Sequence, residues 1–197
     1  MHKSENHSVL LAILVDLSGL SSYHYLRELF KKMGEEMKEN SCCFTGHRNI
    51  AHWKYTQIVN ELSELICGLI HDGITCFYTG GAIGFDTLAA QAVLRAKRNY
   101  AHIKLILLLP CESQTRFWAP EDIAEYEEIK KSADEIHYIS TQYTKSCMFR
   151  RNRALVDSSS ICVCYLEKES GGTAYTVRYA ISKGLQIVNM AKKQASA

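Results

Sequence analysis

The sequence predicts an α/β fold in which a mostly parallel sheet of about six strands is covered by helices on both faces. From Ser41 onward, short apolar runs alternate with amphipathic stretches, the pattern of repeated strand–helix–strand units. The apolar runs are continuous, as expected for strands that are buried on both faces. Because crossovers between parallel strands are right-handed, the carboxyl ends of the strands share one edge of the sheet, where ligands bind in such folds.

The predicted strands are the short apolar runs of this pattern. They cover residues 42–45, 74–78, 103–109, 135–139, 161–165 and 186–190. Between the first two, apolar residues at positions 58, 62, 65, 66, 69 and 70 form one stripe at the period of an α-helix. Asp72-Gly73 provides a plausible end for this helix.

Further helices are predicted between the later strands. One begins at Pro120, because proline suits the first helical turn and the two acidic residues that follow it complement the helix dipole. The others cover about 87–97, 147–156 and 173–183, the last ending at Lys183-Gly184. With no internal repeat and no obvious linker, residues 41–197 are expected to form a single domain.

The first forty residues differ from this pattern and are predicted to be an N-terminal extension. Residues 9–15 form an apolar run that is too short to span a bilayer, which needs about 20 residues. Residues 25–37 carry apolar side chains at helical spacing. Two interpretations stay open: an additional helix that packs on the domain or on a partner, or natural translation that begins at Met33 or Met37.

Composition and charge limit the class of protein. Apolar residues make up 47% and charged residues 22%, which is ordinary for a soluble globular protein. A formal net charge of only +2 argues against nucleic acid and anionic membranes as partners. The cysteines show neither a CxxC pair nor the Cys/His spacing of a zinc site, so no metal site is expected. Most of them lie in apolar segments as free thiols, which suggests the reducing cytoplasm.

Three predicted strands run into glycine-containing sequence at their carboxyl ends. The segments are "TGHR" at 45–48, "TGGAIGFD" at 79–86 and "LEKESGGT" at 166–173. A glycine-rich turn lets backbone N–H groups approach an anion, and the helix that follows adds unpaired N–H groups and partial positive charge. Such turns also occur because tight connections need a positive φ. Several at one edge of the sheet favour a cradle for phosphate, in which Asp86 either caps its helix or binds a ribose or amide group.

The predicted helix at 147–156 carries Arg150, Arg151 and Arg153 in its first turns. Cations near a helix N-terminus are unfavourable by about 0.3–1 kcal/mol each, so a bound anion is one explanation, and guanidinium suits phosphate. A solvated basic face, or ion pairs with acids such as Asp157, is the other. The candidate ligand-binding residues are Thr45, Gly46, His47, Arg48, Thr79, Gly80, Gly81, Gly84, Asp86, Arg151, Asn152, Arg153, Gly171, Gly172 and Thr173.

Several motifs, in this order along the chain, resemble the YpsA-like branch of the SLOG superfamily. They are "CCFTGHR" (42–48), "TGGAIGFDTLAAQAVL" (79–94), "LPCESQTRFW" (109–118), "ADEIHYIS" (133–140), "CMFRRNRALVDSS" (147–159) and "GGTAYTVRYA" (171–180). The superfamily is Rossmann-like and doubly wound, and it includes the cytokinin-activating LOG enzymes and the DNA-processing protein A group. The resemblance implies a site for a nucleotide or nucleotide-derived ligand, such as ADP-ribose or NAD, formed by the glycine turns.

The resemblance also allows a test for LOG-type catalysis, in which an arginine and a glutamate cleave a nucleoside monophosphate to base and ribose phosphate. Arg151 matches the LOG arginine pattern M-x-x-R-K-x-x-M, with Asn152 in place of its lysine. The LOG glutamate is missing, because no acid occurs at 173–182, and catalysis would need Asp86 or Glu167 instead.

We therefore expect a regulator or sensor that binds a nucleotide-type ligand, without established catalysis and without another certain cofactor. A nucleoside 5′-monophosphate phosphoribohydrolase of LOG type is the alternative, and a DNA-handling protein is the second alternative. A homodimer formed through exposed helices is a further expectation.

Overall fold

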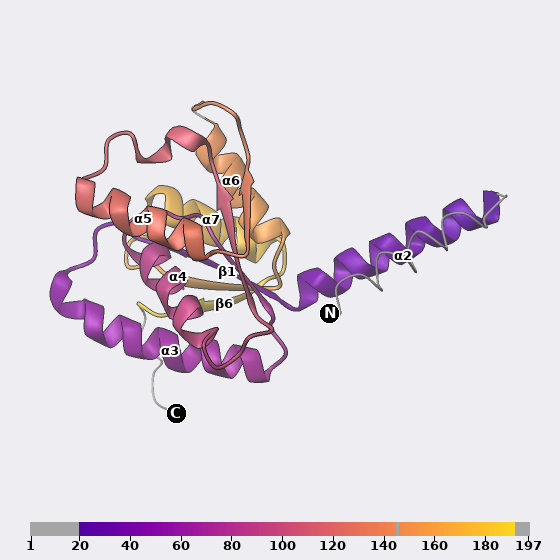
Figure 1. Cartoon of the computed structure of the whole chain (residues 1–197), viewed down its shortest axis with the longest axis horizontal. Coiled ribbons are helices and arrows are strands. Elements are labelled where there is room, and N and C mark those ends of the chain that lie inside the picture. Colours follow the sequence, from indigo (N-terminus) through magenta and orange to yellow (C-terminus); the bar gives the residue numbers. More distant parts are fainter. Residues whose placement is uncertain (1–19, 145, 192–197) are drawn as a thin grey trace. The chain divides into compact units, whose positions relative to one another are not determined.

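In the computed structural model, which describes residues 20–144 and 146–191, six parallel strands form one sheet with helices on both faces (Figure 1). The strand order is β4-β3-β2-β1-β5-β6, and each neighbouring pair is parallel. The strands are β1 (Ser41–Gly46), β2 (Cys76–Thr79), β3 (Lys104–Leu109), β4 (Glu135–Tyr138), β5 (Ile161–Tyr165) and β6 (Gln186–Asn189). The predicted α/β fold with a parallel sheet is confirmed.

The helices fall into two layers that follow from the strand order. They are α2 (Leu20–Glu39), α3 (Tyr55–His71), α4 (Phe85–Ala96), α5 (Pro120–Ser132), α6 (Cys147–Asp157) and α7 (Gly171–Ser182), with short 3₁₀ turns η1 (His52–Lys54) and η2 (Glu112–Thr115). Right-handed crossovers that run outward from β1 to β4 place α3, α4 and α5 on one face, and the return to β5 and β6 places α6 and α7 on the other. The direction reverses between β1 and β5, which is where ligands bind in open α/β sheets.

Alternate residues of the strands build the two cores. Cys42 and Phe44 pack under α3 and α4, whereas Cys43 packs under α6 and α7. Six of the eight cysteines are buried. Burial raises the pKa of the Cys42 thiol well above its ordinary value, so this cysteine acts as a small apolar side chain.

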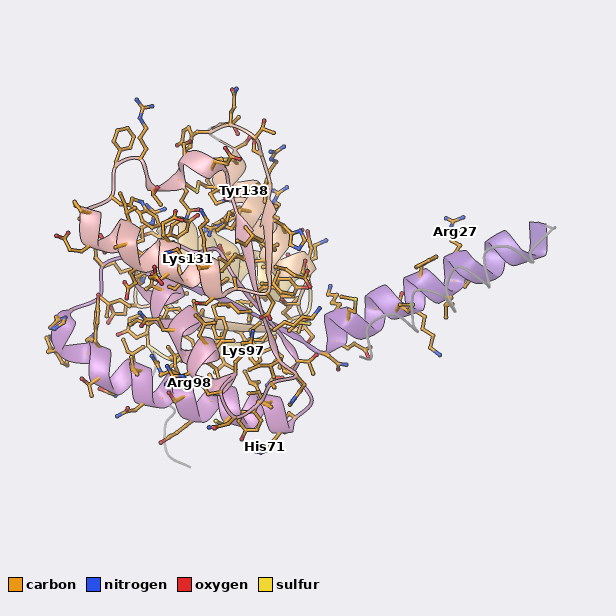
Figure 2. The ribbon with its side chains drawn as sticks, in the orientation of Figure 1. Arg27, His71, Lys97, Arg98, Lys131 and Tyr138 are labelled. Atoms are coloured by element: carbon orange, nitrogen blue, oxygen red, sulfur yellow. The ribbon has the colours of Figure 1, made fainter. Side chains whose placement is uncertain are left out.

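The edge of the sheet at the amino ends of the strands is fixed by an ion pair. Lys97, just after α4 and labelled in Figure 2, places its Nζ 2.6 Å from both carboxylate oxygens of Asp134. Asp134 Oδ2 also accepts the backbone N–H of Leu105 at 2.8 Å. These contacts join the end of α4 to the starts of β3 and β4.

The chain divides into two compact units, Met1–Glu36 and Met37–Ala197. The sheet and helices α3–α7 belong to the second unit, whereas α2 begins in the first. In the part of α2 that belongs to the first unit, Leu29, Phe30 and Met33 are exposed. The apolar run at 9–15 lies outside the described residues. Within the described ranges, no helix combines the length and apolarity that crossing a membrane requires.

Candidate functional site

A cavity of about 280 Å³ lies at the carboxyl edge of the sheet, where segments far apart in the chain meet. The end of β1, the β2–α4 turn, one side of α6 and the first turn of α7 contribute to it, because each of these helices starts at that edge. Of the predicted site residues, the cavity brings together Thr45, Gly46, His47, Arg48, Asp86, Arg151, Asn152, Gly172 and Thr173.

Helix α6 presents one side to the cavity. Met148, Arg151, Asn152 and Leu155 all line it, at the i, i+3, i+4, i+7 spacing of a single helical face. Within this face Arg151 is only 6% exposed. Its Nε and Nη1 atoms are buried and have no hydrogen-bond partner among the described atoms. A buried guanidinium that keeps unused donors is an uncommon and costly arrangement.

Asp86 is the carboxylate that faces Arg151. Its Oδ2 lies 3.7 Å from Arg151 Nη1, too far for a hydrogen bond, and accepts the backbone N–H of Ala82 at 3.4 Å. Burial raises the pKa of Asp86 above its ordinary value, although Arg151 opposes the rise. Burial likewise lowers the pKa of Arg151, and Asp86 opposes that change. For both partners desolvation outweighs their mutual attraction, as is common for buried ion pairs.

The glycines of the β2–α4 turn serve packing within the protein. A Cβ on Gly80 would lie 1.4 Å from Arg151 Nη1, so Gly80 makes room for this guanidinium. Gly84 has a φ of +83°, and a Cβ there would lie 2.3 Å from the carbonyl oxygen of Arg48. By contrast, a Cβ on Gly172 would have no heavy atom within 4 Å, so this glycine borders open space.

This turn corrects the expectation that its backbone N–H groups are free for an anion. The N–H of Gly81 donates to Thr79 Oγ1 (3.4 Å), that of Ala82 to Asp86 Oδ2 (3.4 Å) and that of Phe85 to the carbonyl of His47 (3.2 Å). The turn therefore positions Arg151 and Asp86, and its own amides are largely used inside the protein.

Several predicted residues lie outside the cavity lining, namely Thr79, Gly80, Gly81, Gly84, Arg153 and Gly171. Thr79 is buried below the β2–α4 turn, and Arg153 donates through Nε to Tyr175 Oη at 2.7 Å on the outer side of α6. Ala82, Met148 and Leu155 also line the cavity and are not among the predicted site residues. The helical spacing of Met148 and Leu155 around Arg151 was the signal that could have found those two.

His47 connects the two loops on either side of the reversal point. Its Nε2 accepts the backbone N–H groups of Glu167 (3.0 Å) and Lys168 (3.3 Å). The Glu167 carboxylate lies 2.5 Å from Lys54 Nζ, and this hydrogen bond lowers the pKa of Glu167. Glu167 does not line the cavity, which leaves Asp86 as the carboxylate among the lining residues. Within the described ranges, no group of three or more His, Cys, Asp or Glu is arranged to hold a metal ion.

Comparison with known proteins places this arrangement in a family. A family model described as the YspA SLOG family matches residues 42–193. The chain belongs to the YspA SLOG family. This result confirms the resemblance to the YpsA-like SLOG branch that the motifs indicated.

Relatives of this YspA SLOG chain include two bacterial proteins. It is 29% identical over 138 residues to a UPF0398 protein of Halalkalibacterium halodurans, covering 68% of this chain and 70% of the relative. It is 28% identical over 137 residues to the uncharacterized SPbeta prophage-derived protein YoqJ of Bacillus subtilis, covering 61% and 80%. Neither of these names states an activity.

One solved structure with the same fold concerns the prediction, made from net charge, that nucleic acid is an unlikely partner. DNA processing protein A from Helicobacter pylori, described with a single-stranded DNA binding mode, has a TM-score of 0.58 and 16% identity to this YspA SLOG chain. The match covers 84% of this chain and 71% of that protein, and at this identity it shows the fold. The prediction from the net charge of +2 that nucleic acid is an unlikely partner is corrected here: a protein of this fold is described as binding single-stranded DNA, so a low net charge does not argue against such a partner.

Proposed function

We propose that the cavity binds a nucleotide or nucleotide-derived ligand in a regulatory or sensor role, with Arg151 receiving a phosphate group. The observation that carries this proposal is the Arg151 side chain, which lines the cavity with Nε and Nη1 unpartnered although it is 6% exposed. Phosphate oxygens supply the acceptors that these donors lack, and the planar guanidinium can bind two of them at once.

The surroundings of Arg151 support an anionic group. Arg48 also lines the cavity and adds a second cation. The first turn of α7, with Gly172 and Thr173, borders the same space, and the N-terminus of a helix attracts anions. The volume of about 280 Å³ lies just below the range of small-molecule sites, roughly 300–1,000 Å³, so it suits a phosphate with its sugar better than a whole dinucleotide.

Thermal-shift and calorimetric titrations with AMP, ADP, ADP-ribose, NAD and cyclic nucleotides test the proposal. We expect at least one ligand to raise the melting temperature of the wild-type chain, and Arg151→Ala to abolish the effect. Arg150→Ala is the matched control, because Arg150 is exposed and donates to the carbonyl of Ile139 (3.0 Å) without lining the cavity. If no nucleotide shifts the melting temperature, the proposal fails.

A second variant separates loss of binding from loss of folding. Gly172→Val places its side chain in the open space that borders the cavity, where a Cβ meets no heavy atom within 4 Å. Since Gly172 lies in α7 and replacing a helical glycine does not weaken the helix, we expect equal or higher thermal stability together with loss of nucleotide binding. Retained binding in a folded Gly172→Val protein would place the ligand elsewhere.

A single-stranded oligonucleotide belongs in the same titrations, because a DNA processing protein A with this fold is described as binding single-stranded DNA. Competition between the oligonucleotide and a mononucleotide, together with loss of both in Gly172→Val, would assign both ligands to the cavity. If neither Arg151→Ala nor Gly172→Val weakens binding of the oligonucleotide, nucleic acid binds to another surface.

Cleavage of a nucleoside 5′-monophosphate is the second candidate, and Asp86 is the observation that favours it. Asp86 is the carboxylate in the cavity, and its raised pKa is the direction needed by a general acid. Incubation with a panel of nucleoside 5′-monophosphates should then release free base, and Asp86→Asn should stop the release. Nucleotide binding without release of free base would contradict cleavage and support only the binding role.

A further inference from the structure

Helices α6 and α7 carry a cluster of aromatic rings and an arginine beside the cavity. We call Phe149, Arg153, Tyr175 and Tyr179 the α6–α7 aromatic wall. The rings of Phe149 and Tyr175 meet edge to face, with centroids 5.0 Å apart and an interplanar angle of 81°. The Arg153 guanidinium lies 6.0 Å from the ring centroid of Tyr175 and 5.4 Å from that of Tyr179.

Two members of the aromatic wall, Phe149 and Tyr175, lie one helical turn from residues that line the cavity. Met148 directly precedes Phe149, and Asn152 follows it by about one helical turn. Both residues line the cavity. Tyr175 lies one turn after Gly172, another lining residue. Residues three positions apart share one side of a helix, so Phe149 and Tyr175 stand beside the cavity on neighbouring helices that pack together.

The order of side chains around α6 runs from the buried arginine to the aromatic wall. At about 100° per residue, Asn152 lies between Arg151 and Phe149 around the helix axis. A ligand that places an anionic group on Arg151 and extends toward α7 therefore passes Asn152 before it reaches Phe149.

Phe149 is the free member of the wall. Tyr179 Oη donates to Asp157 (3.0 and 3.3 Å), and Arg153 holds Tyr175 through a 2.7 Å hydrogen bond, so these side chains are fixed by neighbours. Phe149 is backed by Tyr175 but remains 49% exposed. A half-exposed phenyl ring held against a fixed neighbour is the kind of platform on which nucleobases stack.

We propose that the nucleobase of the ligand stacks on Phe149 while its phosphate binds Arg151, with the sugar beside Asn152. The inference rests on the proposed function and adds what it leaves open, namely that the ligand must carry a base. The site then discriminates nucleotides from sugar phosphates and inorganic phosphate. It discriminates weakly among bases, because every base offers a ring face for stacking.

Calorimetric titrations of the full chain with AMP, ribose 5-phosphate and inorganic phosphate test the inference. We expect AMP to bind about tenfold more tightly than ribose 5-phosphate, the gain that one stacked base provides. Phe149→Ala should remove this tenfold difference and leave ribose 5-phosphate binding unchanged, which also shows that the variant is folded. Phe149→Trp should keep the preference for AMP.

Phe117→Ala is the control for the loss of an exposed ring. Phe117 is 89% exposed beneath the guanidinium of Arg116 and does not line the cavity, so its removal should leave all three affinities unchanged. If ribose 5-phosphate and AMP bind equally well to the wild-type chain, or if Phe149→Ala leaves the preference intact, the inference is overturned while the proposed function stands.

Two further outcomes separate the possible failures. If none of the three ligands binds, the proposed function fails first, and the role of Phe149 fails with it. A single-stranded oligonucleotide is a further probe: if Phe149→Ala weakens binding of both the oligonucleotide and AMP, one ring serves both ligands, whereas a loss confined to the oligonucleotide, with the AMP preference intact, overturns the inference.

Discussion

Arg151 and Asp86 are two residues of the site whose burial lowers the stability of the folded protein. Burial raises the pKa of Asp86 and lowers that of Arg151, so the charged form of each is less favourable in the folded protein than in water. The 3.7 Å separation is too long for the hydrogen bonds that could offset this desolvation. The pair lowers the stability of the folded protein but leaves hydrogen-bond donors of Arg151 available in the cavity. This combination is typical of a binding site.

The raised pKa of Asp86 predicts how stability changes with pH. Because the folded state binds the Asp86 proton more tightly than the unfolded state, stability falls as pH rises from the ordinary carboxyl pKa of about 3.9 through the raised folded pKa. Asp86→Asn removes this titration and keeps an oxygen for the Ala82 N–H. Urea unfolding from pH 4 to pH 8 should therefore show Asp86→Asn gaining on the wild-type chain as pH rises, by about 1.4 kcal/mol per unit of raised pKa.

The opposite trend would contradict this prediction. If Asp86→Asn loses stability relative to the wild-type chain over the same range, the attraction between Asp86 and Arg151 exceeds their desolvation. Glu135 provides the control, since Lys104 lowers the pKa of this partly exposed carboxyl and Glu135→Gln should shift the pH profile in the reverse direction.

The three arginines of α6 have different partners, which their sequence positions alone do not reveal. Their charge near a helix N-terminus predicted either a bound anion or a solvated, ion-paired basic face, and only the orientation of α6 toward the sheet decides which arginine faces the cavity. Arg150 binds a backbone carbonyl, Arg153 binds Tyr175, and Arg151 alone is buried in the cavity. The sequence also predicts that the backbone at Gly80 approaches an anion, whereas in the structure the missing Cβ of Gly80 makes room for Arg151, a residue far away in the chain.

Among the elements, the loops after β1 and β5 act as one unit because of His47. Its imidazole Nε2 accepts two backbone N–H groups from the β5–α7 loop, at 3.0 and 3.3 Å. This loop leads directly into the first turn of α7, so the contact helps to hold Gly172 and Thr173 at the cavity.

His47→Ala should loosen this loop while the sheet stays intact. The two N–H groups lose their acceptor in an exposed loop, so we expect a loss of about 1 kcal/mol in global stability at most. Native-state hydrogen exchange should show faster exchange at Glu167 and Lys168 and unchanged exchange in β1 and β5. Unchanged exchange at these two amides would mean that the loop is held by other contacts, and Lys54→Ala would then identify the ion pair with Glu167.

The limits of the elements show why most of the fold could be predicted from sequence. Apolar runs placed every strand within about two residues of its observed bounds, since strands buried on both faces of a parallel sheet have this composition; β4, at the edge of the sheet, is largely exposed. The largest difference is at the start of β2, which the sequence predicts at Ile74. The backbone N–H of Ile74 instead donates to the carbonyl of Leu69 and so belongs to the end of α3. Apolar composition alone does not separate such a closing residue from the strand that follows. Helix α7 begins at Gly171, two residues before the predicted start, where the φ of +87° suits a glycine.

At the scale of the whole molecule, the described core belongs to the second compact unit. Every buried residue of the described chain lies between Ser41 and Leu185. The contacts that precede β1 start at Met37, whose carbonyl accepts the hydroxyl of Ser41, and Asn40, whose carbonyl accepts the N–H groups of Thr75 and Cys76. The residues that fix the sheet and the cavity therefore begin at about Met37.

A chain that begins at Met37 should keep the stability and ligand binding of the full chain. Removal of residues 1–36 takes away none of the described buried residues, so we expect the free energy of unfolding to change by less than about 0.5 kcal/mol and the melting temperature by less than about 2 °C. A chain that begins at Ser41 is the matched control: it also loses the Asn40 carbonyl that pairs with the start of β2, and should melt earlier. Circular dichroism melts and AMP titrations of the three chains measure both properties. A melting temperature several degrees lower for the Met37 chain would show that residues 1–36 contribute to the stability of the second unit.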